Sequence, residues 1–121
     1  MESLVADWSP SPHHAAFSNF ASGGIVSVLM DCHGNWAAAY SLMTLRGAKA
    51  PPGTVTAEYT VRFLKPTPLG ESWRLEAHPT KVEGDKVWVE GKVSAGGKVT
   101  ATMTGLFVAV KKEHPAFHRW Q

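Results

Sequence analysis

One carboxylate, Asp31, stands inside a long apolar segment, and its position suggests a chemical role. Ser27, Asp31 and Asn35 follow one another at intervals of four residues, so in a helix they form one polar stripe. Burying an unpaired carboxylate costs several kcal/mol, so Asp31 either meets hydrogen-bond donors or faces a cleft. In a cleft it would act as a general base on water or as a nucleophile toward an acyl group. The alternative is a structural aspartate that caps neighbouring backbone or pairs with Arg46 or Arg62.

A pair of glycines precedes this stripe and predicts a second chemical feature. If the helix begins near Gly24, Ser22 is a suitable N-cap, and the peptide N–H groups around Gly23 and Gly24 point out of its positive end. Such an end binds an anion, or stabilises negative charge that develops on a carbonyl oxygen during acyl transfer. The alternative is that the glycines only permit a sharp turn into the helix.

The histidines and the single cysteine add no motif with a defined chemistry. His33 lies two residues after Asp31, about 200° around a helix, so the two side chains cannot form a dyad within one helix. A histidine that is packed, or bonded at a subunit interface, is the preferred interpretation. The sequence contains no Cys and His spacing typical of structural zinc, no P-loop, no GxGxxG and no GxSxG, so it predicts neither metal nor cofactor.

The helix that carries these residues is expected to span residues 24 to 46. This segment holds no proline and is closed by Gly47 and Pro51-Pro52. Its apolar residues occupy nearly every direction around the axis, which predicts a helix buried on most sides. A strand from Ser3 to Trp8 and a loop are expected before it.

Four segments after the helix alternate apolar and polar residues with a period of two, which predicts antiparallel strands. In the first, one face is expected to hold Val55, Ala57, Tyr59, Val61 and Phe63, and the other Thr56, Glu58, Thr60 and Arg62. The others are expected at residues 72–82, 86–95 and 98–111. One short strand, one long helix and four strands define an α+β architecture, in which a strongly curved sheet closes over the helix.

The composition of the chain limits the class of protein. Its 121 residues suit a single domain, with residues 112–121 as a tail. The 12 basic and 10 acidic residues are spread along the chain, so no surface for nucleic acid or for a membrane is predicted. With one cysteine, no secretory signal and no membrane span in the sequence, we expect a cytoplasmic protein.

Three segments together resemble a known family. GGIVSVLMDCHGNW at the start of the helix, VTAEYTVRFLKPTPLGE after it and the final TATMTGLFVAV are similar to the hotdog-fold acyl-CoA thioesterases of the phenylacetate-degradation (PaaI-like) type. The resemblance extends from about Ser3 to Val110. It implies a hotdog fold, with a curved antiparallel sheet around a long central helix. It also implies a homodimer, often paired into a homotetramer, with active sites at the dimer interface.

The same resemblance implies roles for individual residues. Gly23 and Gly24 match the position whose backbone N–H polarises the thioester carbonyl. Asp31 matches the acid that attacks or activates water, in many members across the interface from that N–H, and Asn35 matches a residue that positions the nucleophile or the thioester. The substrate-binding candidates are Asn19, Ser22, Ser27, Arg62 and Lys65.

Two features depart from this family. Many relatives have a histidine where this chain has Ser22, so the role of that imidazole in holding the acyl carbonyl is absent or replaced. The segment before the first strand is also shorter than in many relatives.

The sequence therefore predicts a thioester hydrolase that converts an acyl-CoA into the free acid and CoA, with no metal and no cofactor, because CoA is part of the substrate. A hydratase or dehydratase on the same fold is one alternative, and it would require a histidine poised with an acid. A non-catalytic acyl-CoA-binding protein is another. The sequence does not select the acyl group, or CoA over acyl carrier protein.

Overall fold

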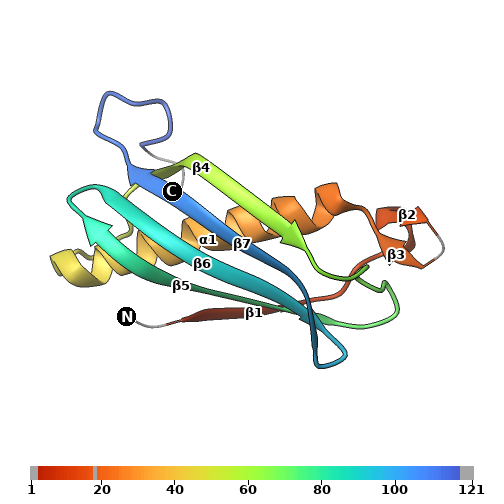
Figure 1. Ribbon diagram of the computed structural model, residues 1–121. Coiled ribbons are helices and arrows are strands. Elements are labelled where there is room, and N and C mark those ends of the chain that lie inside the picture. The colour runs from red at the N-terminus through yellow and green to blue at the C-terminus, as the bar shows by residue number, and fades with distance from the viewer. Residues whose placement is uncertain (1–2, 18, 118–121) are drawn as a thin grey trace.

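One long helix lies across one face of a five-stranded antiparallel sheet in the computed structural model, which describes residues 3–17 and 19–117 (Figure 1). The helix, α1, spans Gly23–Arg46. The strands are β1 (Leu4–Trp8), β4 (Thr54–Phe63), β5 (Trp73–Glu83), β6 (Lys86–Ala95) and β7 (Lys98–Ala109). Their order in the sheet is β1-β5-β6-β7-β4, which leaves β1 and β4 at the two edges. The predicted α+β architecture is confirmed.

Both ends of α1 are fixed by the residues that the sequence indicated. At the start, the side chain of Ser22 accepts a hydrogen bond from the N–H of Gly24, as an N-cap does. At the end, Gly47 adopts the left-handed conformation with φ 63°, and its N–H bonds back to the carbonyls of Met43 and Thr44. The helix is therefore held at a defined length, which fixes the positions of the polar residues along it.

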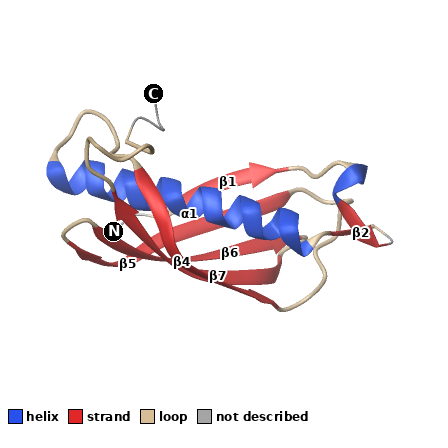
Figure 2. Cartoon of the chain, turned by 90° about the horizontal axis from the view of Figure 1, so that it is seen from above, coloured by secondary structure: helices blue, strands red, loops and turns tan. Residues whose placement is uncertain are grey.

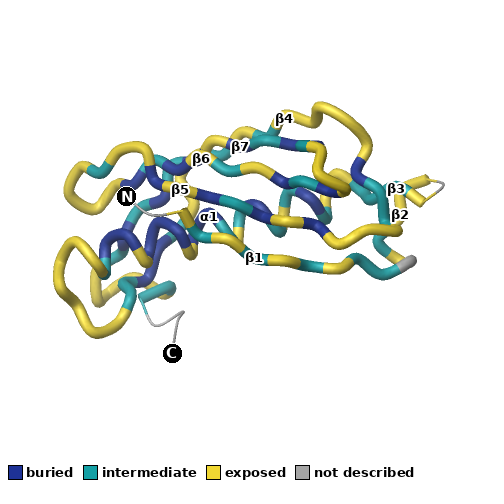
Figure 3. Tube along the Cα trace, turned by 90° about the horizontal axis from the view of Figure 1, so that it is seen from below, coloured by how far each residue is buried: buried dark blue, intermediate teal, exposed yellow. Residues whose placement is uncertain are grey.

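The sheet covers only one side of α1 (Figure 2), so the prediction of a helix buried on most sides is wrong for the single chain. Residues such as Val26, Met30 and Leu42 are buried against inward-facing side chains of the sheet, including Trp73 and Phe107. The opposite side of the helix exposes large apolar residues, namely Val28, Trp36, Tyr40 and Leu45. Figure 3 shows buried segments on α1 and on the sheet, with exposed turns around them. No helix in the described ranges combines the length and the hydropathy that a membrane crossing requires.

A β-bulge in β4 changes which of its side chains face the helix. The register of β4 with β7 shifts between Thr56 and Glu58, and this extra residue inverts the alternation of the strand. The hydroxyls of Thr54 and Thr56 before the bulge, and of Tyr59 after it, all donate hydrogen bonds to atoms of α1. The predicted placement of Thr56 on the face opposite Tyr59 is therefore wrong.

The segment before α1 is more ordered than the loop that the sequence predicted. It contains a 3-10 helix (Pro12–His14) and a two-stranded sheet of β2 (Ala15–Phe17) and β3 (Phe20–Ala21). The N–H of Ser22 donates to the carbonyl of His14 at 2.8 Å, and the N–H of Ala21 donates to that of Thr67 at 2.9 Å. These bonds attach the start of α1 to the 3-10 helix and to the loop between β4 and β5. At the other end of the chain, β7 stops at Ala109, and residues 118–121 of the predicted tail lie outside the described residues.

Candidate functional site

Asp31 is half-buried on α1 beside β4, and its two carboxylate oxygens differ in their surroundings. Its Oδ1 accepts hydrogen bonds from Thr56 Oγ1 at 2.7 Å and from Asn35 Nδ2 at 3.3 Å. Among the residues that the structure describes, none donates a hydrogen bond to Oδ2 or forms an ion pair with Asp31. The alternative in which Asp31 pairs with Arg46 does not occur, because Arg46 binds Asp85 at 2.7 Å.

A buried polar network orients the groups that hold Asp31. Asn35 is 3% exposed and Thr54 is fully buried. The hydroxyl of Thr54 donates to Asn35 Oδ1 at 3.2 Å, while Asn35 Nδ2 donates to Thr56 Oγ1 at 3.0 Å and to Asp31 Oδ1. Because the amide oxygen faces Thr54, the amide nitrogen must face the carboxylate. The donors therefore converge on Oδ1, and Oδ2 remains available to accept a proton.

Thr54 and Thr56 are the site residues that sequence reasoning missed. Strict alternation along β4 places Thr56 away from the helix, and only the bulge turns it inward. Asn35, in contrast, was indicated by the i, i+4 spacing on the helix. Its burial keeps it from a direct contact with substrate, so of the two roles implied by the family, positioning of the nucleophile fits this geometry.

Tyr59 supports the same stretch of the helix. Its hydroxyl donates to the carbonyl of Ser27 at 2.6 Å. Burial, followed by the nearby Asp31 carboxylate and Cys32, raises the pKa of Tyr59 well above its usual value. The phenol therefore stays protonated at neutral pH and continues to act as a donor.

The N-terminus of α1 offers one free N–H group rather than the predicted pair. The N–H of Gly24 donates to Ser22 Oγ at 3.1 Å, so it is already used. The N–H of Gly23 has no acceptor among the described residues. A Cβ on Gly23 would lie 3.2 Å from Cζ of Phe63, so this glycine allows the aromatic ring to approach the helix end closely.

A mostly apolar pocket of about 320 Å³ opens beside this N–H group. Its walls include Phe17, Val26 and Phe63, and Lys65 and Thr67 also line it. The pocket therefore combines apolar surface with a hydrogen-bond donor and one cationic side chain, which is the mixture typical of small-molecule sites.

The two halves of this site are separated within one chain. Gly23 and Asp31 are eight residues apart on a continuous helix, which places their backbones about 12 Å apart at 1.5 Å per residue. An oxyanion donor and an attacking group on one carbonyl must each lie within roughly 3 to 3.5 Å of the reacting atoms. One helix therefore cannot supply both groups to the same thioester.

The remaining predicted residues are dispersed. Asn19 is exposed in the turn between β2 and β3, with φ 59°, and its carbonyl accepts from Leu69 N at 2.8 Å. Arg62 is exposed and alternates away from the inward-facing Tyr59, on the outer face of the sheet. His33 Nε2 lies 2.8 Å from the carbonyl oxygen of Leu4, which confirms its interpretation as a packed histidine. In the described ranges, no three His, Cys, Asp or Glu side chains converge as metal ligands.

Comparison with known proteins identifies the family. The profile of the thioesterase superfamily matches residues 18–100, and the chain therefore belongs to this superfamily. A thioesterase superfamily protein from Shewanella loihica is 32% identical, with a TM-score of 0.75 over 92% of this chain and 86% of that one. No curated protein matches the chain.

Two more distant structures show the fold alone. The PaaI protein of the Escherichia coli phenylacetic acid degradation operon has a TM-score of 0.78 at 14% identity, over 90% of this chain and 73% of that one. A Thermus thermophilus thioesterase complexed with coenzyme A and zinc has a TM-score of 0.73 at 17% identity, over 93% and 88%. The predicted hotdog fold is thereby confirmed.

Proposed function

We propose that the protein is a cytoplasmic acyl-CoA thioesterase in which Asp31 is the catalytic acid–base or nucleophilic group. The observation that carries this proposal is the asymmetry of the carboxylate. Thr56 and Asn35 hold Oδ1, and Oδ2 has no donor among the described residues. A carboxylate fixed at one oxygen and open at the other is prepared to accept a proton from water or to attack a carbonyl carbon.

The N–H of Gly23 supplies the complementary charge stabilisation. In the general-base route, Asp31 Oδ2 takes a proton from water while the water oxygen bonds to the thioester carbon. The carbonyl oxygen becomes an oxyanion and accepts a hydrogen bond from Gly23 N at the positive end of α1. Collapse of the tetrahedral intermediate breaks the C–S bond, releases the acid, and leaves the thiolate of CoA to take up the proton.

The separation of Gly23 from Asp31 supports a homodimer as the active species. Because one helix cannot bring both groups to one thioester, each site would combine Asp31 of one protomer with Gly23 of the partner subunit. The family resemblance implies the same arrangement, often with dimers paired into a tetramer. The sulfur carrier is proposed to be CoA, since structural neighbours were solved with coenzyme A and with acetyl CoA. Lys65, which lines the pocket, would then bind its phosphates.

Replacing Asp31 with Asn tests the function. The variant keeps an acceptor oxygen for Thr56 but removes the base, so we expect kcat for acyl-CoA hydrolysis to fall about 10²- to 10⁴-fold with an unchanged fold. The measurement is release of free CoA thiol from short, long and aryl acyl-CoAs, with thermal unfolding in parallel. Asp7→Asn, which neutralises an exposed carboxylate of β1, is the matched control and should retain activity. Substantial turnover by the Asp31→Asn protein would contradict the proposal, and enoyl-CoA hydration assayed beside it would instead favour the hydratase.

A further inference from the structure

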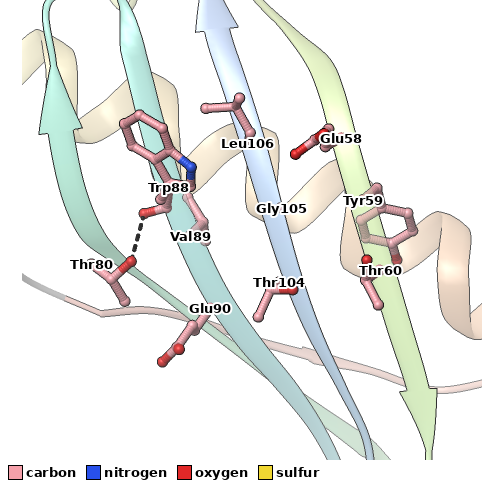
Figure 4. Close-up of a pocket in the computed structure, with 10 residues that line it drawn as sticks. All are labelled: Glu58, Tyr59, Thr60, Thr80, Trp88, Val89, Glu90, Thr104, Gly105 and Leu106. Atoms are coloured by element: carbon pink, nitrogen blue, oxygen red, sulfur yellow. Dashed lines mark hydrogen bonds between the residues drawn. The ribbon is translucent and has the colours of Figure 1, made fainter.

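Three hydroxyl groups of β4 donate hydrogen bonds to successive members of the polar stripe on α1. The pairs are Thr54 with Asn35 at 3.2 Å, Thr56 with Asp31 at 2.7 Å and Tyr59 with Ser27 at 2.6 Å. In the first two pairs the acceptor is a side-chain oxygen, whereas Tyr59 bonds to the backbone carbonyl oxygen of Ser27. A backbone acceptor does not extend from the helix, so the strand must supply a long side chain there. Figure 4 shows Tyr59 on β4, with α1 on the far side of the sheet.

The β-bulge keeps these hydroxyls at nearly the same spacing as the stripe. Across the ladder, the pairs are Thr54 with Ala109, Thr56 with Phe107 and Tyr59 with Gly105, which are alternate residues of β7. Alternate residues of a strand are about 6.6 Å apart, and four residues of a helix rise about 6 Å. A regular strand would instead place Tyr59, three residues after Thr56, on the outer face. The strand register and the hydrogen bond thus assign Tyr59 to the same row.

The acceptor of this bond, Ser27, lies midway along the segment that joins Gly23 to Asp31. It is four residues after Gly23 and four residues before Asp31. In an α-helix each carbonyl accepts the N–H of the fourth residue ahead, so the carbonyl of Ser27 also accepts the backbone N–H of Asp31. A carbonyl oxygen has two lone pairs, and Tyr59 and Asp31 use both of them. The segment is therefore fixed to β4 at its middle.

We propose that Tyr59 is a positioning residue, whose phenol holds the segment of α1 between Gly23 and Asp31 in place. Thr56 and Asn35 set the direction of the carboxylate, whereas Tyr59 sets the location of the backbone that carries it. Burial, followed by the Asp31 carboxylate, raises the pKa of Tyr59, so the phenol keeps its proton and remains a donor. The proposal rests on the proposed function, in which Asp31 reacts and Tyr59 touches no reacting atom.

Replacing Tyr59 with Phe tests the proposal, because the change removes the hydroxyl and keeps the ring. One hydrogen bond between neutral groups is lost, so we expect kcat for acyl-CoA hydrolysis to fall about 3- to 10-fold while KM changes little. Tyr40→Phe removes the phenol of the other tyrosine, which is exposed on α1, and is the matched control that should retain the parent rate. A Tyr59→Phe protein with the parent kcat would overturn the proposal.

The Asp31→Asn background separates positioning from a general effect on the fold. If Tyr59 acts through Asp31, the two changes affect one reacting group and are not additive. Tyr59→Phe should therefore leave the residual turnover of the Asp31→Asn protein unchanged within about twofold. A further fall as large as the one seen in the parent would mean that Tyr59 acts independently of Asp31, and it would contradict the proposal.

Hydrogen exchange tests the contact without a substrate. In the Tyr59→Phe protein, exchange of the Asp31 amide should become about threefold faster or more, while the amides of α1 beyond Tyr40 should exchange at the parent rate. An unchanged rate at Asp31 would show that the phenol does not hold this segment. If exchange responds as expected but the parent hydrolyses no thioester, the proposed function alone is refuted. If the parent is active and Tyr59→Phe keeps its kcat, the role of Tyr59 alone is refuted.

Discussion

At the scale of residues, the reactivity proposed for Asp31 would depend on neighbours that do not react themselves. Thr56 and Asn35 occupy Oδ1, and Thr54 fixes the Asn35 amide so that its nitrogen faces the carboxylate. Hydrogen bonds to charged groups contribute about 1.5 to 3 kcal/mol each, so together these donors define where the carboxylate points. Thr56 is therefore a positioning residue, and Asp31 is the group proposed to touch the substrate.

Replacing Thr56 with Val separates positioning from binding. The change keeps the shape of the side chain but removes the 2.7 Å hydrogen bond to Asp31 and an acceptor for Asn35. Since one bond to a charged group is lost, we expect kcat to fall about 10- to 100-fold while KM changes little. Thr56→Ser, which retains the hydroxyl, should recover most of the rate in the same steady-state assay. A Thr56→Val protein with the parent rate would show that the hydrogen bond is not needed to position Asp31, and a low rate in Ser alone would assign the effect to the methyl packing.

At the scale of elements, the packing of α1 on the sheet depends on one small residue. A Cβ on Gly34 would lie 2.5 Å from Cε of Met103 and 2.7 Å from Cζ of Phe107. The end of Met103 is flexible and can move, but the ring of Phe107 is fully buried and cannot easily do so. The glycine that weakens the helical pattern in the sequence is thus what allows the helix to approach β7 closely.

Gly34→Ala should therefore destabilise the protein although alanine is the better helix former. In an exposed helix the change would add up to about 1 kcal/mol of stability, whereas overpacking of a core costs about 1 to 3 kcal/mol. We expect a net fall in the free energy of unfolding, measured by denaturant titration. Thr44→Ala, at an exposed position of the same helix, is the control and should be neutral or slightly stabilising. A more stable Gly34→Ala protein would show that the ring yields.

The sequence predicted the features of α1 that depend on residues close together in the chain. It did not predict the features that depend on contacts between distant segments. Ser22, Gly47 and the spacing of Asp31 from Asn35 act through neighbouring turns of one helix, so the pattern of residues was sufficient. The bulge at Thr56 depends on how β4 is paired with β7, which no alternation within β4 encodes. The exposed side of α1 depends likewise on how far the sheet extends around it.

At the scale of the whole molecule, one chain contains both halves of the proposed site but holds them apart. The rigid helix that aligns Gly23 and Asp31 also separates them by about 12 Å. In the proposed homodimer a two-fold axis would resolve this, because it would place the start of one helix beside the middle of the other and generate two equivalent sites. Each site would then depend on both protomers, which is a property that mixing experiments can detect.

Two inactive variants should therefore restore activity when their subunits are mixed. Gly23→Pro removes the N–H but suits the first position of a helix, and Ser22, with ψ 138°, already has the extended conformation that precedes proline. When it is mixed with the Asp31→Asn protein, the Gly23→Pro protein should form heterodimers. In each heterodimer, one of the two sites has both an intact Gly23 and an intact Asp31.

Random reassociation makes half of the dimers heterodimers, so we expect about a quarter of the parent activity from a mixture of two nearly inactive proteins. Gly23→Ala, which presses a Cβ against Phe63 but keeps the N–H, is the matched control and should retain most of the activity alone. If the mixture of Gly23→Pro and Asp31→Asn proteins exchanges subunits, as shown by mass, yet gains no activity, the two groups do not serve one site across the interface.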